Sequence, residues 1–377
     1  MLLSNSGSST FFLFLNALDH LRHKFIIEDH QKEYHIWTMN SGTPYFENDF
    51  LLRQRSDYPG TIFVSSRSTI LTGDSNLIGA NISPLPSDRE ALNWYLHNIC
   101  DSSGIHLIYL ENFGNNVHVD VPNLKLLADV LGNARRRVNP GVLEIVVYID
   151  SSTMGGIYNP LEDFEAAFQN VNCPITIIVG LSAIKFLGAG TDRANLGLLY
   201  GKGDKASSIF DFMRQASYTY GEPTLHTIAS MPLVYREILE QRRKRFSFNA
   251  QFLASHLEQR LGQYLRIHYP GLSSHPQHEL AKSLYGDFFG SFFFIELPDQ
   301  KMYQRFMEKV RSYSDDIIAD GTSYGLNTTR VEVRTEEKNG EKNPMGIRMS
   351  VGTENIKQLM LVLDRLEQIT QEVLEIS

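Results

Sequence analysis

Three short apolar stretches separated by helical patterns organise the first half of the chain. They span residues 105–111, 143–150 and 174–181, and β-branched residues or leucine dominate each of them, as is typical of buried strands. Apolar positions recur at helical spacing over 121–137 and 160–170, between these stretches. Strands that alternate with helices predict βαβ units and a parallel sheet covered on both faces.

Polar groups stand where these predicted strands end. Glu111 and Asp150 close the first two, and the third is followed by Ser182 and by Lys185 in a turn of small residues. Parallel sheets bind ligands at the carboxyl ends of their strands. A partly desolvated lysine loses its charge more easily, and a neutral amine can form a Schiff base with an aldehyde. The same window also fits an ordinary surface lysine after a core strand.

The second half predicts one more strand and several helices, followed by a smaller α+β domain. Residues 196–200 form a strand pattern, 206–216 a helix, and 223–265 either two helices or one bent helix. Strands and helices then alternate over 290–297, 300–313, 346–352 and 354–374. We therefore predict a large domain over residues 1–245 and a C-terminal domain over 246–377.

The N-terminus predicts a helix with an anion-binding end. Small residues from Ser6 to Ser9 precede the apolar run Phe11–Leu18. The amides of a first helical turn and the positive end of the helix dipole can hold a phosphate. The apolar run is short and follows no basic residue, so it does not predict a secretory signal.

Composition excludes several classes of partner. The chain has 377 residues, 42% of them hydrophobic, and a formal net charge of -8, so we expect no binding to nucleic acid or to a membrane. It has two cysteines, Cys100 and Cys173, without metal-binding or redox spacing, which favours a reducing, cytoplasmic location. His275 and His278 lack a third ligand nearby, so we predict no metal site.

Several segments resemble, in order and over nearly the whole chain, the motifs of one enzyme family. Ser182-Ala-Ile-Lys185-Phe-Leu-Gly-Ala-Gly-Thr-Asp192 is similar to Ser-x-Thr-Lys-Tyr-x-Gly-Gly-His-Ser-Asp, and Glu111-Asn-Phe-Gly-Asn115-Asn116 is similar to Glu-Ser-Pro-x-Asn-Pro. Arg348-Met-Ser-Val-Gly-Thr-Glu354 resembles Arg-Leu-Ser-Val-Gly-x-Glu. These motifs belong to the cystathionine γ-synthase/γ-lyase family of pyridoxal-phosphate (PLP) enzymes of fold type I. In this family a short strand follows the first helix, and Phe25–Asp29 resembles that strand.

The resemblance implies an α/β fold with a mainly parallel central sheet, flanking helices and a smaller α+β C-terminal domain. It implies that Lys185 carries PLP and moves protons, and that Asp150 faces the pyridine nitrogen. The remaining cofactor contacts that it implies are the phosphate site at Gly7, Ser8, Ser9 and Ser182, the ring contact of Asn115 and the stacking ring of Tyr34.

The resemblance also implies the substrate class and the assembly. Arg348 is expected to hold the α-carboxylate of an amino acid, and Ser323 and Arg330 lie at the position of the family's substrate loop. The expected reaction is β/γ-elimination or γ-replacement on a sulfur-containing or O-acylated homoserine-type substrate. The family forms dimers that often pair, so we expect a homodimer or homotetramer.

Three departures from the family leave alternatives open. Ile184 replaces a threonine, the 320–330 segment differs from the substrate loop, and no counterpart of the family's N-terminal Tyr-x-Arg arm precedes Ser6. Another chain or other residues would then hold the phosphate, or catalysis is lost. The alternatives to the expected reaction are a PLP enzyme of another type, such as an aminotransferase or a biosynthetic cyclase, and a non-catalytic subunit of the same fold.

Overall fold

The computed structural model divides the chain into two compact units. It describes residues 2–4, 6–28, 35–40, 61–65, 89–90, 92–93, 104–133, 142–170, 174–191, 195–220, 223, 225–229, 235–313, 317–338 and 341–374. The N-terminal unit comprises Met1–Asn116, Asp120–Ala183 and Ala194–Met231, and the C-terminal unit comprises Val117–Val119, Ile184–Arg193 and Pro232–Ser377. The division into domains 1–245 and 246–377 stays a prediction.

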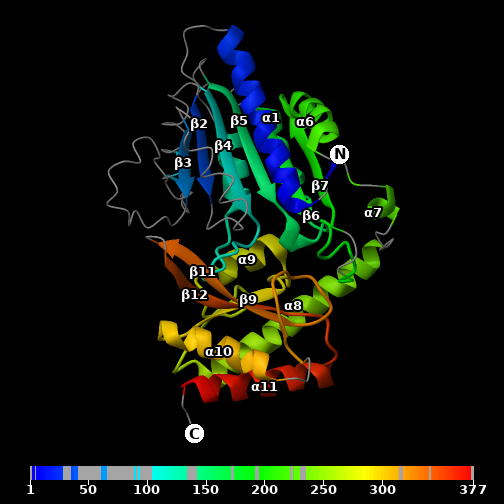
Figure 1. Ribbon diagram of the computed structural model, residues 1–377. Helices are drawn as coiled ribbons and strands as arrows, with labels where there is room; N and C mark the ends of the chain where they lie inside the picture. The colour runs from blue at the N-terminus through cyan, green and yellow to red at the C-terminus, as the bar shows by residue number, and fades with distance from the viewer. Residues whose placement is uncertain are drawn as a thin grey trace. The chain divides into compact units, whose positions relative to one another are not determined.

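A mainly parallel sheet forms the centre of the N-terminal unit. Its strands are β1 (Leu2–Ser4), β2 (His35–Asn40), β3 (Thr61–Ser65), β4 (Gly104–Glu111), β5 (Val142–Asp150), β6 (Ile175–Ser182) and β7 (Gly197–Gly203). Within the described residues their order is β1-β7-β6-β5-β4-β2-β3 (Figure 1). The strands from β6 to β3 run parallel, and β7 pairs antiparallel with β6 and β1. The three apolar stretches of the first half are thus confirmed as the adjacent parallel strands β4, β5 and β6.

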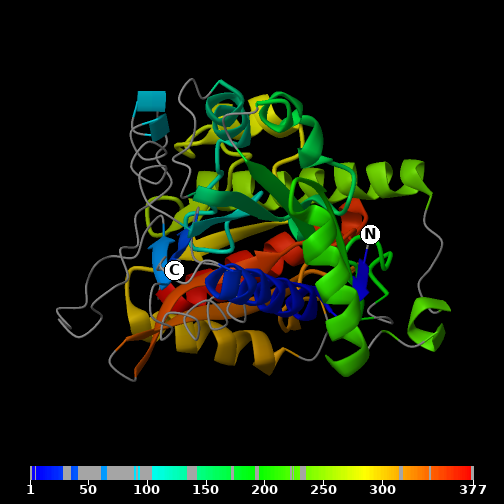
Figure 2. The same cartoon turned by 90° about the horizontal axis from the view of Figure 1, so that it is seen from above.

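Helices cover both faces of this sheet, which explains why its central strands are apolar throughout. On one face lie α1 (Gly7–Glu28) and α6 (Ala206–Tyr220), and on the other α4 (Leu124–Gly132) and α5 (Glu165–Phe168). Figure 2 shows α1 and α4 on opposite sides of the strands. Along β5, Val146 and Tyr148 pack in the cluster with α1, while Ile145, Val147 and Ile149 pack in the cluster with α4. Successive side chains of a strand point to opposite faces of the sheet, so the helices on the two faces bury both sets of β5 side chains.

The first helix differs from the expectation at its end. The apolar run Phe11–Leu18 lies in α1 as predicted, and Phe11, Phe14 and Leu18 are fully buried. The strand expected at Phe25–Asp29 is wrong, because α1 continues to Glu28. Isoleucines at 26 and 27 favour a strand, but neither glycine nor proline stands between Gly7 and Glu28, so no helix-breaking residue ends α1 before Glu28. Among the described residues, no helix combines the length and the hydropathy that crossing a bilayer requires.

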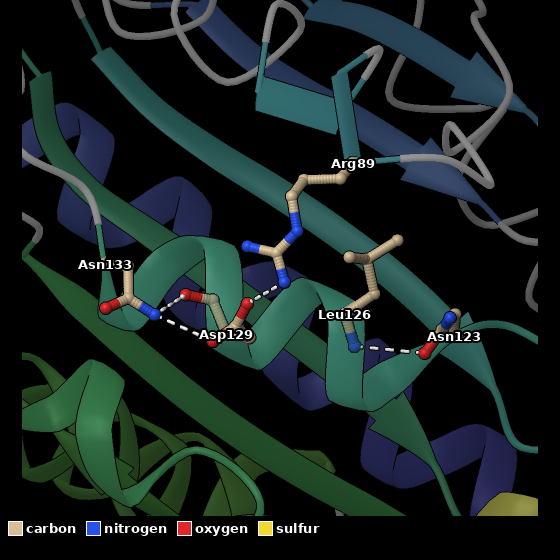
Figure 3. A network of polar contacts seen from close by, with 5 residues as sticks. All are labelled: Arg89, Asn123, Leu126, Asp129 and Asn133. Carbon is tan, nitrogen blue, oxygen red and sulfur yellow. Dashed lines mark hydrogen bonds and ion pairs between the residues drawn. The ribbon is translucent and has the colours of Figure 1, made fainter.

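The helix α4 shows how side chains end a helix. The Leu126 N–H donates to the Asn123 side chain (3.0 Å), which caps the first turn, and the Asn133 amide donates to the Asp129 carbonyl (2.9 Å) at the last (Figure 3). Arg89 forms an ion pair with the Asp129 side chain. The predicted helix over 121–137 is thus confirmed between Leu124 and Gly132. The other predicted helix, 160–170, is reduced to the 3-10 turn η2 (Pro160–Glu162) and the four-residue α5.

A glycine on β6 makes room for a tyrosine on β5. A Cβ on Gly180 would lie 1.9 Å from the Tyr148 hydroxyl oxygen. Tyr148 is 1% exposed, and its ring packs against Phe11 and Phe14 of α1. Burial, with the Asp150 carboxylate adding to it, raises the pKa of Tyr148, while a hydrogen bond with Thr10 acts in the opposite direction. The phenol therefore remains neutral beside the end of β5.

A second sheet forms the centre of the C-terminal unit. Its strands are β8 (Arg266–His268), β9 (Phe292–Glu296), β10 (Ala319–Asp320), β11 (Arg330–Lys338) and β12 (Glu341–Ser350). Within the described residues the order is β10-β11-β12-β9-β8, and all pairs except β10 with β11 are antiparallel. Phe292, Phe293, Phe294 and Ile295 are all fully buried, so β9 is covered on both faces.

The helices of the second half confirm most of the predicted pattern. They are α7 (Leu225–Ala229), which belongs to the N-terminal unit, and α8 (Arg236–Leu261), α9 (His278–Tyr285), α10 (Gln300–Ser312) and α11 (Ile356–Leu374) of the C-terminal unit. The described residues of the segment 223–265 therefore contain two helices, α7 and α8, which agrees with the first of the two predicted alternatives. In the C-terminal unit, α10 packs on β12 and on α11, and α11 packs on α8 (Figure 1).

Candidate active site

In the N-terminal unit, two carboxylates lie at the ends of adjacent strands. Glu111 and Asp150 are the last residues of β4 and β5 and are register partners in the parallel pair. The Ser152 N–H donates to Asp150 Oδ1 (2.9 Å), so the backbone two residues further on orients this side chain. Asp150 is partly buried, whereas Glu111 is 6% exposed. The predicted cofactor acid therefore stands at the carboxyl edge of the sheet, where parallel sheets bind ligands.

Glu111 organises the loop that carries Asn115. The buried Glu111 carboxylate accepts from the Tyr109 hydroxyl (3.0 Å) and from the Asn115 N–H (3.0 Å). Asn115 itself is 5% exposed. The Glu111 carboxylate thus holds the turn after β4 that carries Asn115. This contact is a structural reason for the glutamate to stand four residues before the asparagine in the motif.

The end of β6 is tied to the end of β5 through a serine hydroxyl. The Ser182 N–H donates to Ser152 Oγ (2.8 Å), and Ser152 opens the short 3-10 turn η1 (Ser152–Met154) after β5. The side chains of Ser151 and Thr153 are buried in the same turn, and within the described residues their hydroxyl oxygens have no hydrogen-bond partner. This edge of the sheet thus presents a carboxylate and several hydroxyl groups.

The beginning of α1 lies close to the end of β6. Gly197 of β7 is the register partner of Ser182, and a Cβ on Gly197 would lie 2.1 Å from the Ser6 carbonyl oxygen. The Ser9 N–H donates to Ser6 Oγ (3.0 Å), so Ser6 caps the helix. Gly7 and Ser8 follow in the first turn, where helical amides lack intrahelical partners. The first turn of α1 and Ser182, which are both predicted to contact the phosphate, therefore lie on neighbouring segments.

In the C-terminal unit, Lys185 faces an aromatic ring. It stands three residues after the end of β6, is partly buried, and its Nζ lies 3.6 Å from the centroid of the Tyr324 ring. Tyr324 is 5% exposed and lies between Ser323 and Gly325 in the segment predicted as a substrate loop. Ser323 has a φ of +79°, which is rare for a residue other than glycine.

Arg348 is fully buried against an acid. Its Nη2 lies 2.7 Å from Glu332 Oε1, and the two residues are register partners in the antiparallel pair of β11 and β12. The Arg348 side chain is 0% exposed and that of Glu332 is 10% exposed. Arg334 also approaches Glu332, at 3.4 Å. The cation predicted to bind a carboxylate thus already faces one from its own sheet.

Arg330 shares a face of this sheet with the pair. It lies two residues before Glu332 on β11 and is paired with Ser350, two residues after Arg348 on β12. Its Nη1 donates to the Thr322 carbonyl (3.4 Å), at the beginning of the substrate-loop segment. The structure therefore brings Lys185, Arg348 and Arg330 into the C-terminal unit with the loop that carries Ser323, whereas Asp150, Asn115, Ser182 and the first turn of α1 belong to the N-terminal unit.

Two contacts of the C-terminal unit were not predicted, and one predicted residue cannot be placed. Neither Tyr324 nor Glu332 was a candidate. The sequence feature that could have pointed to Tyr324 is an aromatic residue between a serine and a glycine in the substrate-loop segment. For Glu332, it is an acid that alternates with Arg330 and Arg334 along a strand. Tyr34, the predicted stacking ring, lies outside the described residues.

The two histidines considered as metal ligands, His275 and His278, contact backbone groups. His275 Nε2 donates to the His118 carbonyl (2.7 Å), and its Nδ1 accepts from the Gln277 N–H (3.1 Å). His278 Nδ1 lies 2.7 Å from the Pro270 carbonyl oxygen. Among the described residues, no group of three or more histidines, cysteines or acids is arranged to hold a metal ion.

A family comparison decides the class of the protein. The family model described as "Cys/Met metabolism PLP-dependent enzyme" matches residues 102–365, more than half of the chain. The chain belongs to this family. Pyridoxal phosphate is thus its cofactor, as the resemblance predicted.

Relatives in the family include enzymes of sulfur amino-acid chemistry. The chain is 29% identical over 189 residues to the O-succinylhomoserine sulfhydrylase of Pseudomonas aeruginosa, covering 47% of this chain and 44% of the relative. It is 30% identical over 190 residues to a cystathionine beta-lyase of Lactococcus lactis, covering 48% of each. The chain spans about half the length of the curated relatives it matches.

Solved structures confirm the fold class over most of the chain. The cystathione gamma lyase CalE6 of Micromonospora echinospora superimposes with a TM-score of 0.64 at 17% identity, covering 97% of this chain and 81% of that one. MetB of Corynebacterium glutamicum also gives a TM-score of 0.64, at 16% identity, with 97% and 80% covered. At these identities the likeness shows the fold, which is the predicted fold type I.

The described residues fit the cofactor chemically. PLP requires an amine for its aldehyde, an acid for its ring nitrogen and hydrogen-bond donors for its phosphate. Lys185 supplies an amine after a strand end and Asp150 a backbone-oriented carboxylate. Ser182 and the first turn of α1 supply donors, and the two buried hydroxyl groups after Asp150 add polar atoms in the same turn.

Proposed function

We propose that this protein uses PLP to carry out β/γ-elimination or γ-replacement on a sulfur-containing or O-acylated homoserine-type amino acid. The observation that carries the proposal is the position of Lys185, a partly buried amine three residues after a buried strand in a family lysine motif. The names of the sulfhydrylase and lyase relatives support the substrate class.

The proposal assigns cofactor roles to residues of both units. Lys185 attaches the cofactor, Asp150 pairs with its ring nitrogen, and Asn115 contacts the ring. Tyr34 stacks on the ring, and the phosphate contacts come from Gly7, Ser8, Ser9 and Ser182. When bound, the protonated ring withdraws electrons from the substrate carbon that loses its proton. The hydrogen bond from Ser152 N–H supports this role of Asp150, because it orients the carboxylate without neutralising it.

Substrate binding is assigned to the C-terminal unit. Arg348 binds the α-carboxylate, while Ser323 and Arg330 contact the rest of the amino acid. A guanidinium has five N–H donors, so it can face Glu332 and a substrate carboxylate together. Once released from the cofactor, the Lys185 amine takes the proton from Cα.

Replacing Lys185 tests the proposal directly. The purified protein is mixed with PLP, reduced with borohydride and digested, and the labelled peptide is identified by mass spectrometry. We expect the label on Lys185 in the parent protein, and loss of both label and turnover in Lys185→Ala. Lys202→Ala is the matched control, because Lys202 forms an exposed ion pair with Glu165 (2.7 Å). Labelling that persists in Lys185→Ala would overturn the assignment.

Product analysis distinguishes the reaction type. Elimination from a sulfur amino acid releases ammonia, an oxo acid and a thiol, whereas transamination leaves the sulfur on the oxo acid and produces the pyridoxamine form. We expect thiol release with cystathionine or a related substrate. An oxo acid that keeps its sulfur would contradict the proposed reaction and favour an aminotransferase.

Assembly and location complete the proposal. We propose a homodimer or homotetramer in the cytoplasm. The family supports the assembly, and the presence of two cysteines without paired spacing supports a reducing compartment. Light scattering of the purified protein measures the assembly, and a monomer at micromolar concentration would contradict it.

A further inference from the structure

The ring of Tyr324 lies over the amine that the proposed function uses. Lys185 Nζ is 3.6 Å from the ring centroid, well within the distance at which a cation is attracted to the face of an aromatic ring. Tyr324 is 5% exposed and Lys185 is partly buried, so bulk water screens this attraction less than it would at an open surface. Both residues belong to the C-terminal unit.

The backbone on both sides of Tyr324 adopts the left-handed conformation. Ser323 has a φ of +79° and Gly325 a φ of +76°. A Cβ on Gly325 would lie 3.1 Å from the Cβ and carbonyl carbon of Lys185 and 3.1 Å from the nitrogen of Phe186. The glycine thus lets the loop backbone approach the backbone of the lysine closely, and the two left-handed residues bracket the ring that covers its amine.

Neighbouring rings fix the plane of Tyr324. The centroid of Phe292 lies 5.3 Å from that of Tyr324, and the centroid of Phe186 lies 6.3 Å away. Phe292 is fully buried and Phe186 is 3% exposed, so the aromatic cluster leaves Tyr324 little freedom to rotate. The guanidinium carbon of Arg348 lies 5.9 Å from the same centroid, so one ring faces two cations of the proposed site.

We propose that Tyr324 is a positioning residue for Lys185: its ring holds the amine in place and favours the protonated form of the lysine. This inference deepens the proposed function and rests on it for its meaning in catalysis. During turnover the proton leaves Cα for Nζ, and the electron pair of the C–H bond stays with the substrate carbon. The negative face of the ring then stabilises the ammonium that forms.

A titration of cofactor-free, full-length protein tests the attraction. Reductive methylation with 13C-formaldehyde labels the lysines, and NMR follows the pH at which each dimethylamine loses its proton. The Lys185→Arg variant assigns the Lys185 signal. Residue 324 is then replaced by phenylalanine and by phenylalanines with one, two and three fluorine atoms, which keep the ring shape and weaken its negative face. We expect the midpoint to fall with each fluorine, by about 0.4 to 1.5 pH units over the series.

Two controls separate this effect from general changes in the protein. Tyr324→Phe alone should leave the midpoint nearly unchanged, because the ring face and not the hydroxyl carries the attraction. The same fluorinated series at Tyr313, whose ring lies 3.6 Å from the guanidinium carbon of Arg365, should leave the Lys185 midpoint unchanged. A Lys185 midpoint that does not respond to fluorination at 324 would overturn the proposal.

The outcome is independent of the test of the proposed function. The titration uses protein without cofactor, so it reports on the ring and the amine whether or not the enzyme turns over. The proposed function fails on a different result, which is borohydride labelling that persists in Lys185→Ala. A falling midpoint together with such labelling would leave the attraction established and the catalytic assignment of Lys185 wrong.

Discussion

The polar groups of the two units are held in different ways. In the N-terminal unit, the Asp150 carboxylate is oriented by a backbone N–H two residues further on, and Glu111 accepts from a backbone N–H four residues further on. In the C-terminal unit, Lys185 faces the ring of Tyr324, which belongs to a loop distant in sequence. Arg348 faces Glu332, which lies on the neighbouring strand. The acids are positioned by their own turns and the cations by long-range packing.

This difference predicts how each group responds to substitution. A turn reforms its backbone hydrogen bonds around a similar side chain, so changes at the acids should affect chemistry more than stability. A long-range pair leaves a buried charge behind when one partner is removed, and that charge cannot regain water. Changes at the partners of the cations should therefore lower the free energy of unfolding.

The largest effect is expected at Glu332. Glu332→Met removes the carboxylate that faces the fully buried guanidinium of Arg348, and breaking such a pair costs about 3–5 kcal/mol. The free energy of unfolding, measured in urea, should fall by that amount. The double variant Glu332→Met/Arg348→Met should regain most of it, because an apolar pair of similar volume is often neutral. An unchanged free energy in the single variant would show that the ion pair does not hold Arg348.

A smaller effect is expected at Gly325. Gly325→Ala forces a side chain into a left-handed position and places its Cβ 3.1 Å from the Lys185 backbone, for a combined cost of about 2–4 kcal/mol. Gly321→Ala is the control in the same segment, because the added Cβ would meet only Arg330 side-chain atoms, at an ordinary contact distance of 3.8 Å, and it should cost less than about 1 kcal/mol. Equal losses of unfolding free energy would rule out close packing of the loop on the lysine.

The smallest effect on stability is expected at Asp150. Asp150→Asn keeps an oxygen that accepts from the Ser152 N–H, so the free energy of unfolding should change by less than about 1 kcal/mol. Turnover should fall by on the order of tenfold to a thousandfold. Without the Asp150 carboxylate, the pKa of the proposed neighbouring cation, the protonated ring nitrogen of the cofactor, falls by about 1–3 units. Urea unfolding and steady-state kinetics measure the two effects. A large loss of stability would show that the turn does not adapt as its local hydrogen bond suggests.

The comparison also explains which features the amino-acid sequence could predict. The strands that carry Glu111, Asp150 and Ser182 were predictable, because strands buried on both faces are continuous apolar runs. The start of α1 at Ser6 was also predictable, because a helix cap depends only on residues close together in the sequence. The roles of these residues toward the cofactor stay predictions, which the labelling and turnover experiments test.

The contacts around the cations were not predictable from local patterns. The pairing of Glu332 with Arg348 depends on the register of β11 and β12, and that register shifts at an irregularity between Arg334 and Thr335. The approach of Tyr324 to Lys185 depends on two left-handed residues and a ring cluster drawn from separate segments. At Phe25–Asp29, local strand preference gave way to the continuation of α1.

The fit of Tyr148 against Gly180 has a consequence for how the family can diverge. With the phenol oxygen 1.9 Å from where a Cβ would stand, position 180 cannot gain a side chain while position 148 keeps its tyrosine. Descendants of this sequence should therefore exchange the two positions together, with a small residue at 148 accompanying any side chain at 180. Such paired replacement would appear as covariation between neighbouring strands and would mark the lineages that share this core.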